Sequence, residues 1–234
     1  MSANVRTERN HAFVLKQEQV KRLWESFQSR IGSPTIIIKC SDEVRREYDN
    51  WKSFSNYENP PNKSIKRLII KARSGDYSKR AEVEFSDSTY RVIDIDIDAS
   101  ETVVTNLYDD ISDILDGTKP WYSRLTKIDF FYVIGFVFWA GYIFLTFYTG
   151  EPAEKTAVTV KQAFTATIVV GLFFAGLATL IWGLNKLRHR IFPLAYFAIG
   201  QGLQRYELDE KIRWGVIIAF LISISSSTVF ALFQ

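Results

Sequence analysis

The sequence predicts an α+β domain followed by an all-α membrane module of three transmembrane helices. The first half of the chain is rich in charged residues, whereas three apolar segments without charge lie in the second half, at 130–149, 163–185 and 214–233. A hydrocarbon core about 30 Å thick needs about 20 mostly apolar residues at 1.5 Å each, so each segment is long enough to span it. We therefore predict a cytoplasmic domain at 1–120, a connector at 121–129 and a transmembrane module at 130–234.

Composition narrows the class of protein further. Residues 1–120 carry 19 basic and 20 acidic side chains, so the net charge of +3 comes from the membrane half. Charges of mixed sign do not favour a nucleic-acid polymer as partner. A single cysteine, Cys40, excludes an intramolecular disulfide and suits a reducing compartment. The polar start of the chain predicts no cleavable signal peptide, so the first span is expected to direct insertion.

The basic residues that flank the spans predict the orientation. Three precede the first span, and six lie between the second and third: Lys119, Arg124 and Lys127, then Lys186, Arg188, Arg190, Arg205, Lys211 and Arg213. Between the first two spans, Lys155 and Lys161 are offset by Glu151 and Glu154. The positive-inside rule then places the N-terminus in the cytoplasm and the C-terminus outside a plasma (inner) membrane.

Hydrophobic periodicity predicts the elements of the cytoplasmic domain in the order αβα, then βββα. Helical spacing of apolar residues predicts helices over 14–31 and 42–54, and a β-branched run between them predicts a buried strand over 35–40. After a loop with Pro60 and Pro61, short turns predict an antiparallel meander of three strands, over 65–73, 81–85 and 90–97. Ser100 is expected to cap a last helix, which Gly117 and Pro120 end.

The main chemical candidate in this domain is a set of three alternating carboxylates, Asp94, Asp96 and Asp98. Alternation places them on one face of a strand, about 6.8 Å apart, where neighbours would need converging side chains to share a divalent cation. Cross-strand pairing with basic residues of the neighbouring strands explains the same pattern and is the favoured reading. The candidate partners are Lys66, Arg67, Lys71, Arg73 and Arg80.

No catalytic constellation accompanies these carboxylates. His11 and His189 lack metal-ligand spacing, Cys40 has no neighbouring histidine, and no glycine-rich phosphate loop is present. We therefore expect a protein that is not an enzyme and has no cofactor.

Small residues at every fourth position predict how two of the spans pack. The second span carries Gly171, Ala175, Thr179 and Gly183, and the third carries Gly215, Ala219, Ser223 and Ser227. Helices associate in lipid through close backbone approach and interhelical hydrogen bonds, so these stripes predict tight packing within or between copies. We therefore predict that the protein forms a homo-oligomer in the lipid bilayer.

The first and third spans have their own compositions. Aromatic residues surround the first span, which we expect to face lipid, and no span contains a charge, which argues against a transporter. The third span has a run of hydroxyls at Ser223, Ser225, Ser226, Ser227 and Thr228. They either line a narrow wet path or bond back to their own helix; packing is favoured over pore lining.

The segment 186–213 is predicted to form a cytoplasmic helical connection, with a helix beginning at Pro193. It can touch the cytoplasmic domain, so Trp121, Arg188, Arg190, Arg205 and Arg213 are candidates for coupling the domain to the spans.

Two functions fit this layout, although no motif identifies a family. The first is an oligomeric membrane protein whose cytoplasmic domain senses a small-molecule ligand or protein partner and controls permeation. Its layout is similar to that of membrane-acting effectors of bacterial antiviral defence, by architecture alone. The alternative is a membrane-anchored adaptor that recruits a cytoplasmic protein without forming a pore. A metal-dependent enzyme that uses the three aspartates is the weakest hypothesis.

Overall fold

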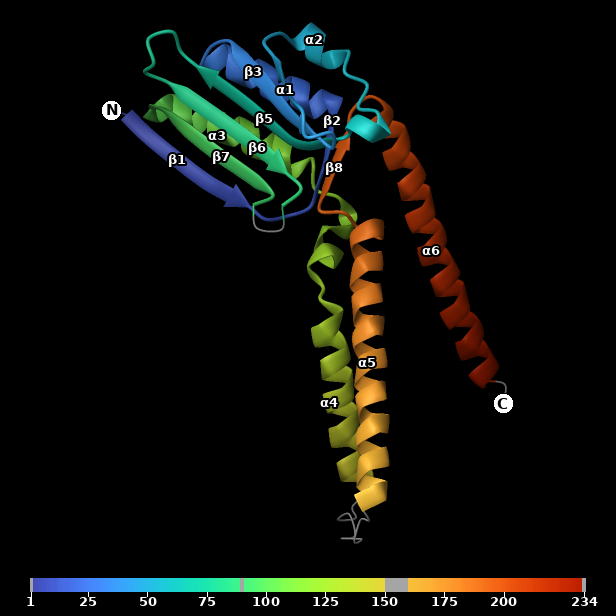
Figure 1. Cartoon of the computed structure of the whole chain (residues 1–234). Coiled ribbons are helices and arrows are strands. Elements are labelled where there is room, and N and C mark those ends of the chain that lie inside the picture. The colour runs from blue at the N-terminus through green and yellow to red at the C-terminus, as the bar shows by residue number, and fades with distance from the viewer. Residues whose placement is uncertain (1, 89–90, 150–159, 233–234) are drawn as a thin grey trace. The chain divides into compact units, whose positions relative to one another are not determined.

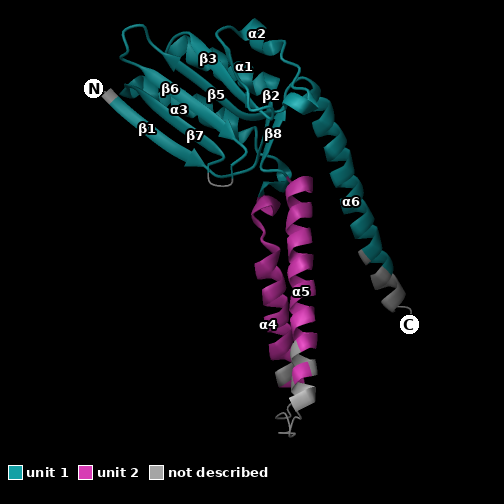
Figure 2. Ribbon diagram, viewed as in Figure 1, with its two compact units in different colours: residues 1–123, 193–234 teal, residues 124–192 magenta. Residues whose placement is uncertain are grey.

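The computed structural model describes residues 2–88, 91–149 and 160–232. They form two compact units, residues 1–123 with 193–234 and residues 124–192 (Figure 2). The first unit contains a mixed α/β domain with an antiparallel sheet, and the second contains two long helices.

A six-stranded antiparallel sheet forms the centre of the first unit (Figure 1). Its order is β1-β7-β6-β5-β3-β4, so the predicted meander is present as β5, β6 and β7. The strands are β1 (Ser2–Arg9), β3 (Pro34–Cys40), β4 (Arg45–Tyr48), β5 (Ile65–Arg73), β6 (Arg80–Ser86) and β7 (Ile93–Ser100). Tyr90, where the last strand of the meander was expected to begin, lies outside the described residues.

Helices α1 (Gln17–Arg30) and α3 (Glu101–Asp116) cover one face of this sheet (Figure 1). Alternate residues of the central strands point into the core; Ile93, Ile95 and Ile97 of β7 are fully buried there. The α3 helix begins directly after Ser100 and stops before Gly117, as the sequence predicts, but the Ser100 side chain makes no capping hydrogen bond. Because this face is continuous and apolar, its burial supplies most of the drive for folding.

Three predictions of local structure within the first 60 residues are corrected. The polar start of the chain forms the edge strand β1, whose Ala3 and Val5 pack against the core. The helix expected over 42–54 is instead β4, which pairs with β3, followed by the short helix α2 (Trp51–Ser55). The helix expected from residue 14 begins at Gln17, since the strand β2 (Phe13–Lys16) takes the preceding residues.

The segment after the second apolar helix also differs from its prediction. In place of a helix from Pro193, the strand β8 (Ala195–Ala198) pairs in parallel with β2. The helix α6 (Gln201–Leu232) follows. The apolar stretch predicted over 214–233 is therefore the second part of a longer helix, which begins 13 residues before that stretch. Residues 193–234 are grouped with the sheet in one compact unit.

The second unit contains the helices α4 (Phe130–Thr149) and α5 (Val160–Ile191). They contact each other through Phe138 and Phe173, whose ring centroids lie 5.9 Å apart. The carboxylate of Asp129 accepts hydrogen bonds from the Phe131 amide at 2.9 Å and from the Asn185 side chain at 3.2 Å. Two short 3₁₀ helices are also present, η1 (Pro61–Lys63) and η2 (Trp121–Lys127).

Among the described residues, one helix is long and apolar enough to cross a membrane, the Ile168–Ile191 part of α5. A second span is present if the bent pair of η2 and α4 is counted as one. The third of the three expected spans, in α6, is not among the helices that meet this test. The full three-span arrangement and its orientation thus stay predictions.

Candidate functional site: the junction between the domain and α6

The candidate site is the place where the last helix leaves the mixed α/β domain. We call it the junction and define it as β2, residues 58–59, residues 121–123, β8 and residues 200–214. All of these residues belong to the first compact unit.

Strand β2 joins two distant parts of the chain at this junction. The amide of Phe13 donates to the Leu194 carbonyl at 2.9 Å, which fixes the segment that leads into β8. The Val14 amide donates to the Thr118 carbonyl at 2.8 Å, and the Ala12 amide donates to Ser123 Oγ at 3.1 Å. The residues on either side of the α4–α5 segment are therefore both bonded to one buried strand.

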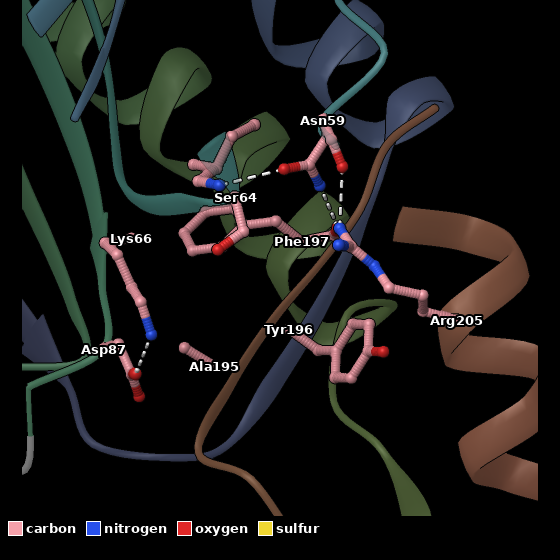
Figure 3. Close-up of a pocket in the computed structure, with 9 residues that line it drawn as sticks. Asn59, Ser64, Lys66, Asp87, Ala195, Tyr196, Phe197 and Arg205 are labelled. Atoms are coloured by element: carbon pink, nitrogen blue, oxygen red, sulfur yellow. Dashed lines mark hydrogen bonds and ion pairs between the residues drawn. The ribbon is translucent and has the colours of Figure 1, made fainter. Parts of the chain in front are cut away.

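Asn59 holds β8 and α6 against the sheet (Figure 3). It is 1% exposed, and its side chain donates to the Phe197 carbonyl at 3.0 Å and accepts from the Ile65 amide at 2.9 Å. Its own carbonyl accepts from Arg205 at 2.7 Å. Asn59 has a φ of +50°, a left-handed conformation that asparagine tolerates better than most residues. Asn59 thus connects β5, β8 and α6, and we call this set of contacts the Asn59 clamp.

Two glycines allow the start of α6 to approach this clamp closely. A Cβ atom at Gly200, where φ is +51°, would lie 2.6 Å from the Glu58 carbonyl oxygen. A Cβ atom at Gly202 would lie 2.5 Å from Asn59 Nδ2 and would also overlap the Phe197 carbonyl oxygen. Backbone contact of this kind requires glycine, and here it brings the Gln201 amide to 2.7 Å from the Glu58 carbonyl.

A buried arginine lies about two turns beyond Arg205 on α6. Arg213 is 1% exposed and donates to Glu210 at 2.7 Å, and its guanidinium carbon is 4.7 Å from the ring centroid of Tyr122. Trp121 donates to the same carboxylate at 2.8 Å, and its indole packs against Trp214 with centroids 5.4 Å apart. A buried charge is tolerated only when paired, so this arrangement fixes the helix against residues 121–122.

The ionisation of the junction follows from these surroundings. Burial raises the pKa of the Tyr122 phenol, with Arg213 opposing the shift. Burial and a hydrogen bond to Asp209 raise the pKa of Tyr196. Burial alone would raise the pKa of Glu210, but the hydrogen bonds from Trp121 and Arg213 outweigh it and lower that pKa. Near neutral pH the site therefore holds neutral phenols beside an ionised carboxylate–guanidinium pair.

The structure brings three of the five candidate coupling residues together. Trp121, Arg205 and Arg213 lie in the junction. Arg188 and Arg190 instead lie near the end of α5 in the other unit, where Arg188 contacts His189 at 3.0 Å. The sequence analysis missed Asn59, Tyr122, Gly200 and Gly202. A buried asparagine in a loop carries no periodic signal, and the two-glycine spacing before a helix is the only hint of close packing.

The small-residue stripes lie on exposed helix surfaces within one copy of the chain. A Cβ atom added at Gly171, Gly183 or Gly215 would meet nothing within 4 Å. Thr179 donates back to the Ala175 carbonyl at 2.9 Å, and Ser225 does the same to Leu221. The Ser225 bond follows the back-bonding alternative for the hydroxyl run of the third span. Ala219, Ser223 and Ser226 lie along the apolar half of α6, and the side chain of Ser227 lies outside the described residues.

The three aspartates of β7 lie on the open face of the sheet, away from α1 and α3. Asp96 is paired with Arg80 and Asp94 lies 3.8 Å from Arg6, while Asp98 is opposite Arg80 in the strand register. Across the part of the chain that the structure describes, no group of three His, Cys, Asp or Glu side chains could hold a metal ion. Ion pairing between strands is thus the arrangement observed for Asp94 and Asp96.

The chain was also compared with known proteins. No family model, curated protein or solved structure matches it, so the functional argument rests on the geometry of the junction.

Proposed function

We propose that this chain is an oligomeric integral membrane protein whose mixed α/β domain senses a ligand or protein partner and controls membrane permeation through α6. The domain lies in the cytoplasm, and α4, α5 and the apolar half of α6 span the plasma membrane. The protein acts by helix rearrangement rather than by catalysis.

One observation carries the proposal: α6 is a continuous helix from the Asn59 clamp to its apolar half. Its first half is bonded to the domain through Arg205, which donates to the Asn59 carbonyl, and through Glu210, which accepts from Trp121; the second half exposes large apolar side chains such as Phe220. Because a helix transmits rotation and translation along its axis, a change at the clamp would reorient the apolar half. The apolar window of α5 supports membrane insertion, since none of its residues is buried within the structure.

Ion flux from liposomes that contain the purified full-length chain tests the proposal. We expect measurable flux, and Ser223→Leu should reduce it because a large side chain on α6 disrupts the helix packing of the oligomer. Val216→Pro should break the helix between its docked and apolar halves and abolish control by the domain, whereas Val216→Ala should not. Equal permeability of all of these liposomes and protein-free ones would contradict the proposal.

The adaptor remains the second candidate, and the open face of the sheet favours it. That face carries charged side chains in cross-strand pairs, among them Arg67 with Glu84 at 2.8 Å. Around Ile37 and Ile69 it is hollowed into a cavity of about 420 Å³ that Lys71 and Glu82 help to line. A protein that binds this face and leaves ion flux unchanged would favour the adaptor over the permeation protein.

A further inference from the structure

A cavity of about 210 Å³ lies at the junction, between the start of β5 and the start of α6 (Figure 3). Its polar lining comes from Asn59, Ser64, Lys66, Asp87, Tyr196 and Arg205. Figure 3 shows Lys66 and Arg205 on opposite sides of it, one from the sheet and one from α6. A molecule bound here would touch both parts that the Asn59 clamp holds together.

The charges around this cavity are not balanced. Lys66 lies 3.8 Å from Asp87, but the one hydrogen bond that Arg205 donates within the described residues goes to the Asn59 carbonyl at 2.7 Å. No carboxylate in the described part of the chain lies within ion-pair distance of Arg205. By contrast, Arg67 on the open sheet face is paired with Glu84. Two cations and one carboxylate leave the cavity positive, with guanidinium N–H groups still available.

From this geometry we infer that the cavity binds a small phosphate-class oxyanion. Guanidinium and ammonium groups recognise phosphoryl oxygens through charge-assisted hydrogen bonds, and Ser64 lines the same cavity with a hydroxyl that can donate. Its volume is below the roughly 300 Å³ of sites for drug-sized ligands, so it suits inorganic phosphate or one phosphoryl group of a larger molecule. The role of this anion as the ligand that the domain senses rests on the proposed function. Its binding to the cavity does not.

The phosphoryl group could come from solution or from a lipid. Arg205 precedes Trp214, where the apolar half of α6 begins, by nine residues or about 14 Å along the helix. The headgroup layer extends only about 5 to 8 Å beyond the hydrocarbon core. A soluble anion is therefore the better match to the position of the cavity.

Thermal unfolding of the full-length chain, in nanodiscs of neutral phosphatidylcholine at constant ionic strength, tests the binding. We expect inorganic phosphate to raise the unfolding temperature in a saturable way, and acetate not to. Lys66→Gln removes one charge-assisted contact and should weaken phosphate binding about tenfold. It should leave the fold intact, because the Lys66 side chain is exposed. Arg205→Lys should also weaken binding, since lysine lacks the forked donor geometry.

Lys63→Gln is the matched control, because Lys63 is exposed and does not line the cavity. Equal phosphate affinity of Lys63→Gln and Lys66→Gln, or no saturable shift in the parent protein, would overturn the inference. The same measurement is repeated in nanodiscs that contain phosphatidic acid. If that lipid abolishes the phosphate-induced rise in unfolding temperature in the parent but not in Lys66→Gln, the phosphoryl group comes from the bilayer. Flux is measured separately, so phosphate binding without any flux would contradict the proposed function and leave the site standing.

Discussion

Helices α5 and α6 are both 32 residues long, yet they place their charged residues in different surroundings. The basic end of α5, with Lys186 and Arg190, is exposed within its unit. On α6, Arg213 is 1% exposed and contacts Tyr122 and Glu210. A similar charge pattern in the sequence thus serves as a solvated helix end in one case and as part of a packed core in the other.

This difference has a mechanical consequence. An exposed basic end sets the orientation of a span by the positive-inside rule but transmits nothing from a folded domain. On α6 the pair of Arg213 and Glu210 restricts the rotation of the helix, because turning it would break the cation–π contact of Arg213 with Tyr122 and the hydrogen bond that Trp121 donates to Glu210. We therefore expect α6 rather than α5 to carry a change in the domain toward the membrane.

The largest expected effect comes from removing the buried charge. Arg213→Met leaves Glu210 without its cation and Tyr122 without its cation–π contact, so we expect unfolding to become easier by about 3 kcal/mol. Arg190→Met on α5 should change it by less than about 0.5 kcal/mol. Urea unfolding of the full-length protein in detergent, followed by tryptophan fluorescence, measures both. Similar losses for the two variants would remove the contrast between the helices.

A glycine-to-alanine pair should give opposite signs on the two helices. Alanine normally favours a helix over glycine by up to about 1 kcal/mol, and Gly171 on α5 has open space for the added methyl group. At Gly202 the same methyl group would overlap Asn59 and the Phe197 carbonyl, and such overpacking costs about 1–3 kcal/mol. The same urea titration measures both free energies. Stabilisation by Gly202→Ala would mean that the clamp is looser than described.

Sequence patterns predicted those elements whose buried face is visible as a regular spacing of apolar residues within the element itself. The alternation of Ile93, Ile95 and Ile97 with three aspartates predicted β7 and its two faces, and helical spacing predicted α1 and α3. The strand β1 was missed because Ala3 and Val5 form only a weak apolar face.

The junction was harder to predict because its contacts join distant segments. The pairing of β2 with β8 connects residue 13 to residue 195, and no local pattern indicates a parallel partner so far along the chain. Arg213 was selected only for its place between two spans, because its burial depends on Tyr122 and Glu210. The Asn59 clamp needs the Phe197 carbonyl of β8, the Ile65 amide of β5 and the Arg205 side chain of α6, a combination that a single sequence does not reveal.

The two helices can also be compared in self-association, because each carries a stripe of small residues. Gly171→Leu on α5 and Ser223→Leu on α6 each insert a large side chain into a surface suited to close helix approach. We expect each to weaken the oligomer by about 1 kcal/mol, or roughly fivefold in the association constant. Native mass spectrometry or light scattering of the detergent-solubilised chain measures the oligomer. Loss with one variant alone would assign the packing face to that helix.

The last contrast is in the pH dependence of stability and concerns two carboxylates, one in each region, whose pKa values are lowered. Hydrogen bonds from Trp121 and Arg213 outweigh burial at Glu210, and bonds from the Phe131 amide and Asn185 lower the pKa of Asp129. A depressed pKa adds stability above the ordinary pKa, 4.5 for glutamate and 3.8 for aspartate, which is lost as the pH falls through the folded value.

Because Glu210→Gln leaves the buried Arg213 without its carboxylate, we expect it to cost about 3 kcal/mol at neutral pH, as Arg213→Met does. This difference from the parent protein should shrink below about pH 4.5. Asp129→Asn should show its loss at a lower pH, and only in the unfolding of the α4–α5 unit. Unfolding titrations across pH separate the two, since Trp121 and Trp214 report on the junction and Trp139 and Trp182 on the other unit. A pH-independent cost of Glu210→Gln would mean that its carboxylate contributes by shape and hydrogen bonding rather than by charge, and the buried Arg213 would then need another counter-charge to hold α6 in place.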